Sequence, residues 1–169
     1  MAAKDKILDI LKQAYQIEIN GHTFYSMTAD KCEKPAAKEL FQKLAYDEVQ
    51  HQNYLKSVGK KYKKDGVKAF DTTLKSHSMG KFATDLFTDK FVDQARGATF
   101  EMGALSVGMT LETNAMALFH KAAAGADSKE VKSFYAFLEE WEKDHFDALK
   151  NLFDQLRNDY WGEGGFSPF

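Results

Sequence analysis

The sequence has few residues that could cross-link the chain or interrupt it. Cys32 is the only cysteine among 169 residues. An internal disulfide is therefore excluded, and so is a CxxC pair that could hold zinc or iron. Proline occurs only at positions 35 and 168, so almost nothing breaks a helical pattern. With a single thiol, we expect a reducing, cytoplasmic environment.

Long apolar runs and an excess of one charge are also missing. No stretch comes near the roughly 18 consecutive apolar residues that a membrane helix needs, so we expect no membrane partner. The first residues, MAAKDKILDILK, carry charges through their first turns, which argues against a signal peptide. A net charge of -2 gives no reason to expect a nucleic-acid partner.

What the sequence does contain is long helical periodicity, without strand signals. Apolar residues recur at steps of three and four in four segments, which are about 3–32, 35–58, 97–124 and 128–158. Asp127 or Ser128 can cap the last segment. The short links between the first two and the last two segments predict two antiparallel hairpins.

The remaining segments complete the expected single domain, residues 1–169. Residues 59–96 are long enough to cross the bundle, and about 78–94 within them have a helical pattern of their own. Residues 159–169 form an aromatic C-terminal tail. One long crossover between two helical hairpins predicts an all-α, ferritin-like four-helix bundle.

Each of the four segments carries one glutamate on its apolar stripe. The pattern E…ExxH occurs twice, as Glu18, Glu48 and His51 and then as Glu112, Glu142 and His145. Each residue of the second set follows its counterpart by 94 positions, so the second hairpin repeats the first. Composition alone predicts about 0.3 Glu-x-x-His pairs by chance, whereas two occur at matching places.

A lone histidine or glutamate on such a stripe is usually a satisfied core residue or a solvated charge. Here that interpretation would bury four carboxylates together, each at a cost of several kcal/mol, with no Arg or Lys on the same stripes. Without cations, burial and like charge should raise all four carboxyl pKa values. Two divalent cations would balance the four charges, and carboxylates with imidazoles suit iron or manganese. We therefore predict two iron ions per chain, with manganese or a mixed centre as the alternative.

The expected roles of the ligands follow from helix geometry. Residues at i and i+3 share one helix face, so Glu48 can act together with His51. We expect Glu48 and Glu142 to bridge the two metals. The ends would then pair Glu18 with His51 and Glu112 with His145, or the reverse.

These residues give nearly the whole chain a resemblance to the rubrerythrin branch of the ferritin-like superfamily. The matching motifs are Glu18 followed by Tyr25, LAYDEVQH at 44–51, Glu112, EEWEKDH at 139–145 and the C-terminal YWGEGGFSPF. The tail is similar to that of stand-alone members, which lack a rubredoxin domain. The resemblance implies a non-haem di-iron centre that reacts with hydrogen peroxide or dioxygen, using electrons from an external carrier such as rubredoxin. It also implies that Tyr25 hydrogen-bonds a ligand glutamate.

One residue departs from the family pattern. Rubrerythrins usually carry a second glutamate three residues after the one equivalent to Glu112, and that position is Ala115. The exchange of that glutamate with a histidine ligand is therefore in question, and the six-ligand set is closer to bacterioferritin. His22, Glu101 and Glu139 are the candidates that could join the site in its place, although roles outside the site are favoured for them.

Three functions are compatible with these features. The leading interpretation is a di-iron oxidoreductase that reduces hydrogen peroxide in oxidative-stress defence. The alternatives are a ferroxidase linked to iron storage and a non-catalytic metal-binding bundle. We expect a homodimer or a higher homo-oligomer. A positive patch formed by Lys60, Lys61, Lys63 and Lys64 could dock an acidic electron carrier.

Overall fold

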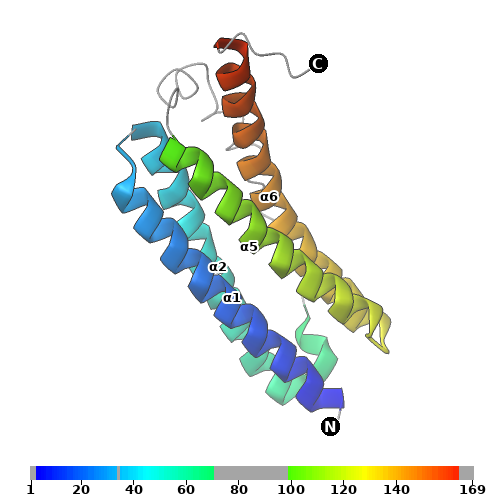
Figure 1. Ribbon diagram of the computed structural model, residues 1–169. Coiled ribbons are helices and arrows are strands. Elements are labelled where there is room, and N and C mark those ends of the chain that lie inside the picture. The colour runs from blue at the N-terminus through cyan, green and yellow to red at the C-terminus, as the bar shows by residue number, and fades with distance from the viewer. Residues whose placement is uncertain (1–2, 34, 71–98, 164–169) are drawn as a thin grey trace.

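A computed structural model describes residues 3–33, 35–70 and 99–163, which form helices and no strand (Figure 1). The elements are α1 (Ala3–Lys31), α2 (Pro35–Asp65), the 3-10 helix η1 (Gly66–Ala69), α5 (Thr99–Ala124) and α6 (Lys129–Glu163). The predicted all-α, ferritin-like bundle is confirmed. Across these described ranges, no helix is long and apolar enough to span a membrane.

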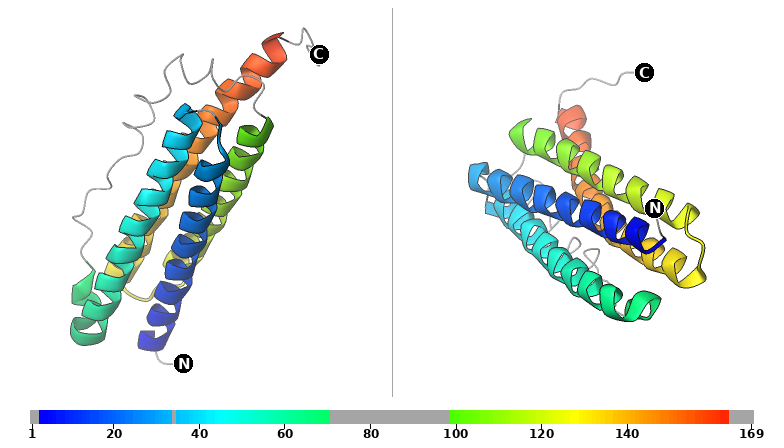
Figure 2. Two further views of the ribbon diagram at one scale, coloured as in Figure 1. Left: turned by 90° about the vertical axis from the view of Figure 1, so that its left-hand side faces the viewer. Right: turned by 90° about the horizontal axis from the view of Figure 1, so that it is seen from below.

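The helices are arranged as two antiparallel hairpins that pack side by side. Helix α1 packs along α2, α5 packs along α6, and α1 also contacts α5 (Figures 1 and 2). The end of α2 and the start of α5 lie at opposite ends of the bundle, so the chain between them has to connect the two ends. The helical pattern predicted for about 78–94 lies outside the described residues.

Two helices are longer than predicted. We expected the second helix to end near Gly59, but α2 continues to Asp65, and Gly66 then adopts a φ of 62°. Glycine inside a helix costs only about 1 kcal/mol relative to alanine, so Gly59 does not end this one. Helix α6 likewise continues to Glu163, five residues into the predicted tail, because no glycine or proline occurs between 129 and 161. The crossover therefore begins at residue 66 rather than 59.

Ser128 caps the start of α6. Its Oγ accepts a hydrogen bond from the backbone N–H of Val131 at 3.2 Å. Replacing Ser128 with alanine should lower the free energy of unfolding by about 1 kcal/mol, because a helix N–H loses its partner. Chemical denaturation of the metal-free protein measures this loss, with Asp127→Ala as the control. An equal loss in the control would mean that Asp127 shares the capping role.

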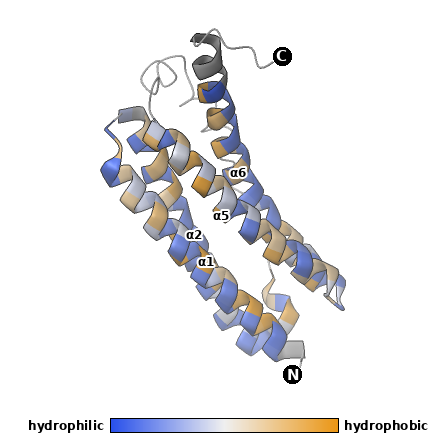
Figure 3. Cartoon of the chain, in the orientation of Figure 1, coloured by the Kyte–Doolittle hydropathy of each residue, from blue (hydrophilic) through white to orange (hydrophobic). Residues whose placement is uncertain are grey.

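The bundle core consists of two apolar clusters with a layer of carboxylates between them. The cluster near the start of α5 includes Tyr25, Leu40, Phe41, Leu105 and Leu149. The cluster near the other end includes Leu11, Leu55, Phe119, Phe134 and Leu138. Hydrophobic and hydrophilic residues alternate along every helix, as expected when one face is buried (Figure 3). The predicted stripes are therefore core stripes, and each passes through the carboxylate layer.

Candidate metal centre

The six residues of the doubled E…ExxH pattern lie together in this layer. None of the six is more than 9% exposed. Their potential ligand atoms form three overlapping groups, each within 4.8 Å: Glu18, His51 and Glu142; Glu112, Glu142 and His145; and Glu48, His51 and His145. The fold therefore brings together every residue that the repeat singled out.

The ends of the site are paired within each repeat. His51 Nδ1 lies 3.1 Å from Glu18 Oε2, so the first histidine belongs with the first glutamate. His145 Nδ1 lies 3.7 Å from Glu112 Oε1. Of the two arrangements left open by the sequence, the side chains adopt the uncrossed one.

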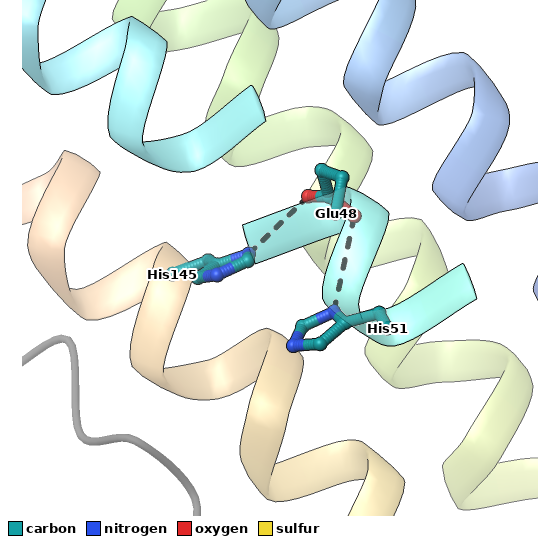
Figure 4. Close-up of side chains that lie close together, drawn as sticks. All are labelled: Glu48, His51 and His145. Carbon is teal, nitrogen blue, oxygen red and sulfur yellow. Dashed lines mark ion pairs between the residues drawn. The ribbon is translucent and has the colours of Figure 1, made fainter. Parts of the chain in front are cut away.

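Glu48 and Glu142 occupy the middle of the site. The Glu48 carboxylate lies between the two imidazoles, with Oε1 3.3 Å from His145 Nδ1 and Oε2 3.9 Å from His51 Nδ1 (Figure 4). Glu142 belongs to both end groups. A carboxylate shared by two groups has the position that a bridging ligand requires.

Two buried atoms at the centre have no hydrogen-bond partner, and this tests whether a metal fits. They are Glu142 Oε1 and His145 Nδ1. The His145 nitrogen is close to Glu48 but is not aligned for a hydrogen bond. Leaving such atoms unpaired costs about 1–3 kcal/mol each, whereas a metal would coordinate them. Four carboxylates and two imidazoles are ligands for iron or manganese, so the residues fit such a centre.

Burial changes the ionisation of the carboxyl groups. It raises the pKa of Glu18 to about 7 and raises the pKa values of Glu48 and Glu142 well above the usual carboxyl range. Neighbouring carboxylates raise the pKa values of Glu48 and Glu142 further. The expectation that all four pKa values rise is wrong for Glu112. Burial alone would raise its pKa, but contacts with His145 and Tyr25 lower it.

The two histidines differ in their ionisation. Burial and the neighbouring imidazole of His145 lower the pKa of His51 to about 4, so His51 is neutral near pH 7 and can donate a lone pair to a metal. Burial would also lower the pKa of His145, but its contacts with Glu112 and Glu48 raise it well above 6.5. Without a metal, the His145 proton therefore partly balances the carboxylates.

Tyr25 makes the hydrogen bond that the resemblance to rubrerythrins implied. Its side chain is fully buried, and its hydroxyl donates to Glu112 Oε1. Replacing Tyr25 with phenylalanine keeps the packing but removes this bond, and partners of this kind are worth about 10–100-fold in metal affinity. Competition with a chelator should therefore show an affinity loss in this range for Tyr25→Phe and none for Tyr15→Phe. Unchanged affinity in the first variant would remove Tyr25 from the site.

A stack of rings behind the site was not predicted. The His51 ring lies between Trp141, at 4.3 Å, and His145, at 5.1 Å, and both are nearly parallel to it. The rings of Tyr54 and Phe137 approach Trp141 at 4.8 and 4.9 Å. This packing holds the His51 ring in the plane that directs Nδ1 at the carboxylates. The available signal was that Trp141 directly precedes a predicted ligand.

The three additional candidates lie outside the site. The ring of His22 contacts the backbone oxygen of Ala45 at 3.0 Å, and Glu139 lies 3.2 Å from His120. Glu101 is buried near the start of α5, away from the site. Burial raises the pKa of the Cys32 thiol to about 11, and the charge of Glu101 adds to this. None of the three belongs to the candidate ligand groups among the described residues. Nothing there replaces the glutamate that the family usually has at the position of Ala115.

Comparison with known proteins identifies a family whose model covers the candidate site. The family model for rubrerythrin matches residues 9–153, a range that contains all six site residues and Tyr25. Searches of curated proteins and of solved structures gave no match. Members of the matched family usually bind iron and are generally oxidoreductases. The match covers most of the sequence, and the chain therefore belongs to the rubrerythrin family.

Proposed function

We propose that this protein is a di-iron peroxidase that reduces hydrogen peroxide to water with electrons from an external carrier. The observation that carries this proposal is the arrangement of the ligands. Two Glu–His ends flank two central carboxylates, and the whole set is buried between two apolar clusters. Such an arrangement suits two neighbouring ions of one hard metal.

Two iron ions bound there would each supply one electron, which together with two protons converts one peroxide molecule to two waters. The protein would hold the ions in place through the uncrossed ends, Glu18 with His51 and Glu112 with His145. Glu48 and Glu142 would fix the distance between the two ends. Tyr25 orients Glu112, and the Trp141 stack orients His51.

Electrons have to reach the site through the protein surface. One cysteine cannot build an iron–sulfur relay, and the sequence has no glycine motif for a nucleotide cofactor. The patch of Lys60, Lys61, Lys63 and Lys64 is exposed at the end of α2. An acidic one-electron carrier such as rubredoxin could dock there, with a rate that falls as salt is added.

Stopped-flow absorbance tests the choice of oxidant. Protein loaded with ferrous iron without oxygen should be oxidised faster by hydrogen peroxide than by dioxygen. Steady-state turnover with reduced rubredoxin should slow as salt rises, and also in a Lys60→Gln/Lys61→Gln variant. Faster oxidation by dioxygen with mineral growth would favour iron storage, and salt-independent turnover would exclude the lysine patch.

A further inference from the structure

A pocket reaches the carboxylate layer from the surface between α1 and α5. Its volume is about 170 Å³, and its lining includes the buried carboxylates of Glu48, Glu112 and Glu142. The histidines are not part of the lining. A small molecule in this pocket would meet the site on its carboxylate side, away from the ring stack of α2 and α6.

The outer wall of the pocket follows the internal repeat. Ile17 and Leu111 line it as one pair, and Asn20 and Asn114 line it as another. The members of each pair are 94 positions apart, the same offset that relates the two halves of the ligand set. The pocket therefore lies where the two hairpins meet, beside the two central carboxylates and Glu112.

Gly21 sets the width of this pocket. A Cβ added there would lie 3.0 Å from Glu48 Cδ and 3.1 and 3.3 Å from its carboxylate oxygens. A larger residue would therefore push the Glu48 carboxylate or fill the space beside it. The repeat counterpart, Ala115, is buried and does not line the pocket.

The mouth of the pocket is polar but uncharged. Asn20 and Asn114 are exposed there, and each carboxamide offers both donors and an acceptor. Gln16 donates to Asn20 Oδ1 at 3.0 Å, which leaves the Asn20 N–H groups for another partner. Between Lys12 and Asp30 on α1, the exposed residues carry no formal charge.

The face of α5 beside the mouth has the same character. Its exposed residues between Glu101 and Lys121 carry no formal charge, because the one carboxylate in that stretch, Glu112, is buried. An ion would find no opposite charge to attract it at such a mouth. A neutral molecule with hydrogen-bonding groups could exchange its hydrogen bonds to water for hydrogen bonds to the two carboxamides. The volume is well below the roughly 300 Å³ at which pockets for drug-sized ligands begin.

We propose that this pocket is the binding and access site for hydrogen peroxide, with Asn20 and Asn114 hydrogen-bonding the neutral molecule at the mouth and Gly21 setting the size limit. The narrow pocket beside Gly21 would also exclude bulky organic hydroperoxides. This inference rests on the proposed peroxidase function for its substrate. The route itself can be tested without that function.

The test of the route uses nitric oxide, a neutral diatomic molecule that hydrogen-bonds weakly. Its association with ferrous-loaded protein is followed by anaerobic stopped-flow absorbance, which does not depend on turnover. Gly21→Ala should slow association about 10-fold. The control is Gly103→Ala on α5, where an added Cβ meets nothing within 4 Å. If Gly21→Ala lowers the iron content, Ile17→Phe is used instead, because it narrows the pocket from another lining residue that is not one of the six candidate ligands. Unchanged association in iron-replete variants would overturn the route.

The test of recognition compares oxidants. The double variant Asn20→Leu/Asn114→Leu should slow oxidation by hydrogen peroxide about 10-fold and leave nitric oxide association within 2-fold of the unaltered protein. Cumene hydroperoxide should react at least about 100-fold more slowly than hydrogen peroxide. If hydrogen peroxide oxidises the double variant as fast as the unaltered protein, the asparagines do not recognise peroxide. If Gly21→Ala slows nitric oxide association but the protein does not react with peroxide, the access route is retained and the peroxidase function is overturned.

Discussion

Replacing Glu142 with alanine should reduce the iron content after anaerobic loading from about two ions per chain to one or fewer. Glu142 belongs to both end groups, so its loss removes a ligand from both metal positions. Peroxide turnover should fall by at least about 100-fold, because even partners that only orient a ligand are worth 10–100-fold. Elemental analysis together with peroxide consumption measures both effects. The corresponding change at Glu48 should have a similar result.

Two variants show whether the loss is specific to a central ligand. Glu18→Ala removes a ligand from one end only, so one metal position should keep its iron. Glu139→Ala lies three residues before Glu142 on the same helix but pairs with His120, so iron content should not change. Two ions retained in Glu142→Ala, or none retained in Glu18→Ala, would contradict the assignment of central and end ligands.

The metal-free protein should lose stability as pH rises from 6.5 to 8. The folded-state pKa values of Glu48 and Glu142 are raised well above the ordinary 4.5, mainly by burial. The native state therefore holds protons that the unfolded state has released. Stability from such groups is fully present below pH 4.5 and is lost as pH rises through the folded pKa. A carboxyl that is protonated in the native state and ionised in the unfolded state costs about 1.4 kcal/mol of stability per pH unit.

The histidines determine which pH range is informative. The pKa of His51 is lowered to about 4, so this group opposes the trend only between about pH 4 and 6.5, where the unfolded state takes up a proton. The pKa of His145 is raised, so above pH 6.5 it adds to the loss of stability. The range from 6.5 to 8 is therefore free of the opposing contribution.

Chemical denaturation of metal-free protein at several pH values measures this slope. Glu142→Gln removes one carboxyl without changing its shape, so this variant should show a smaller slope and exceed the unaltered metal-free protein in stability at pH 8. Bound metal should remove the decline, because it favours the deprotonated ligands. Parallel pH profiles for the two metal-free proteins would show that these carboxyls are not protonated in the native state.

The clustering of the six candidate ligands could be predicted from sequence because these residues interrupt a pattern that is otherwise regular. On an apolar stripe at steps of three and four, Glu112 and Glu142 stand out as residues that cannot be buried without compensation. The repeat then places both halves in one layer. The predicted stripes are buried, as this pattern requires, whereas the hydrogen bond of Tyr25 was implied by the family resemblance.

The features that were missed depend on tertiary packing. Gly59 has the residue type of a helix end, but only backbone geometry shows that the positive φ occurs at Gly66. The choice between crossed and uncrossed ends depends on how the hairpins dock, and both are compatible with the same spacing. Trp141 has an ordinary place on a partly apolar face until its contact with His51 is known. Periodicity identifies which residues are buried and does not specify which atoms meet.

The division of the candidate ligands between the two hairpins would couple metal binding to separation of the hairpins. Glu18, Glu48 and His51 come from one hairpin and the other three ligands from its neighbour, so pulling the hairpins apart would separate each central carboxylate from half of its partners. A metal that binds only the closed form opposes separation by about 2.7 kcal/mol when its concentration is 100 times its dissociation constant. Iron supply would then determine how often the bundle opens, and hydrogen exchange in the two core clusters would slow as iron is added.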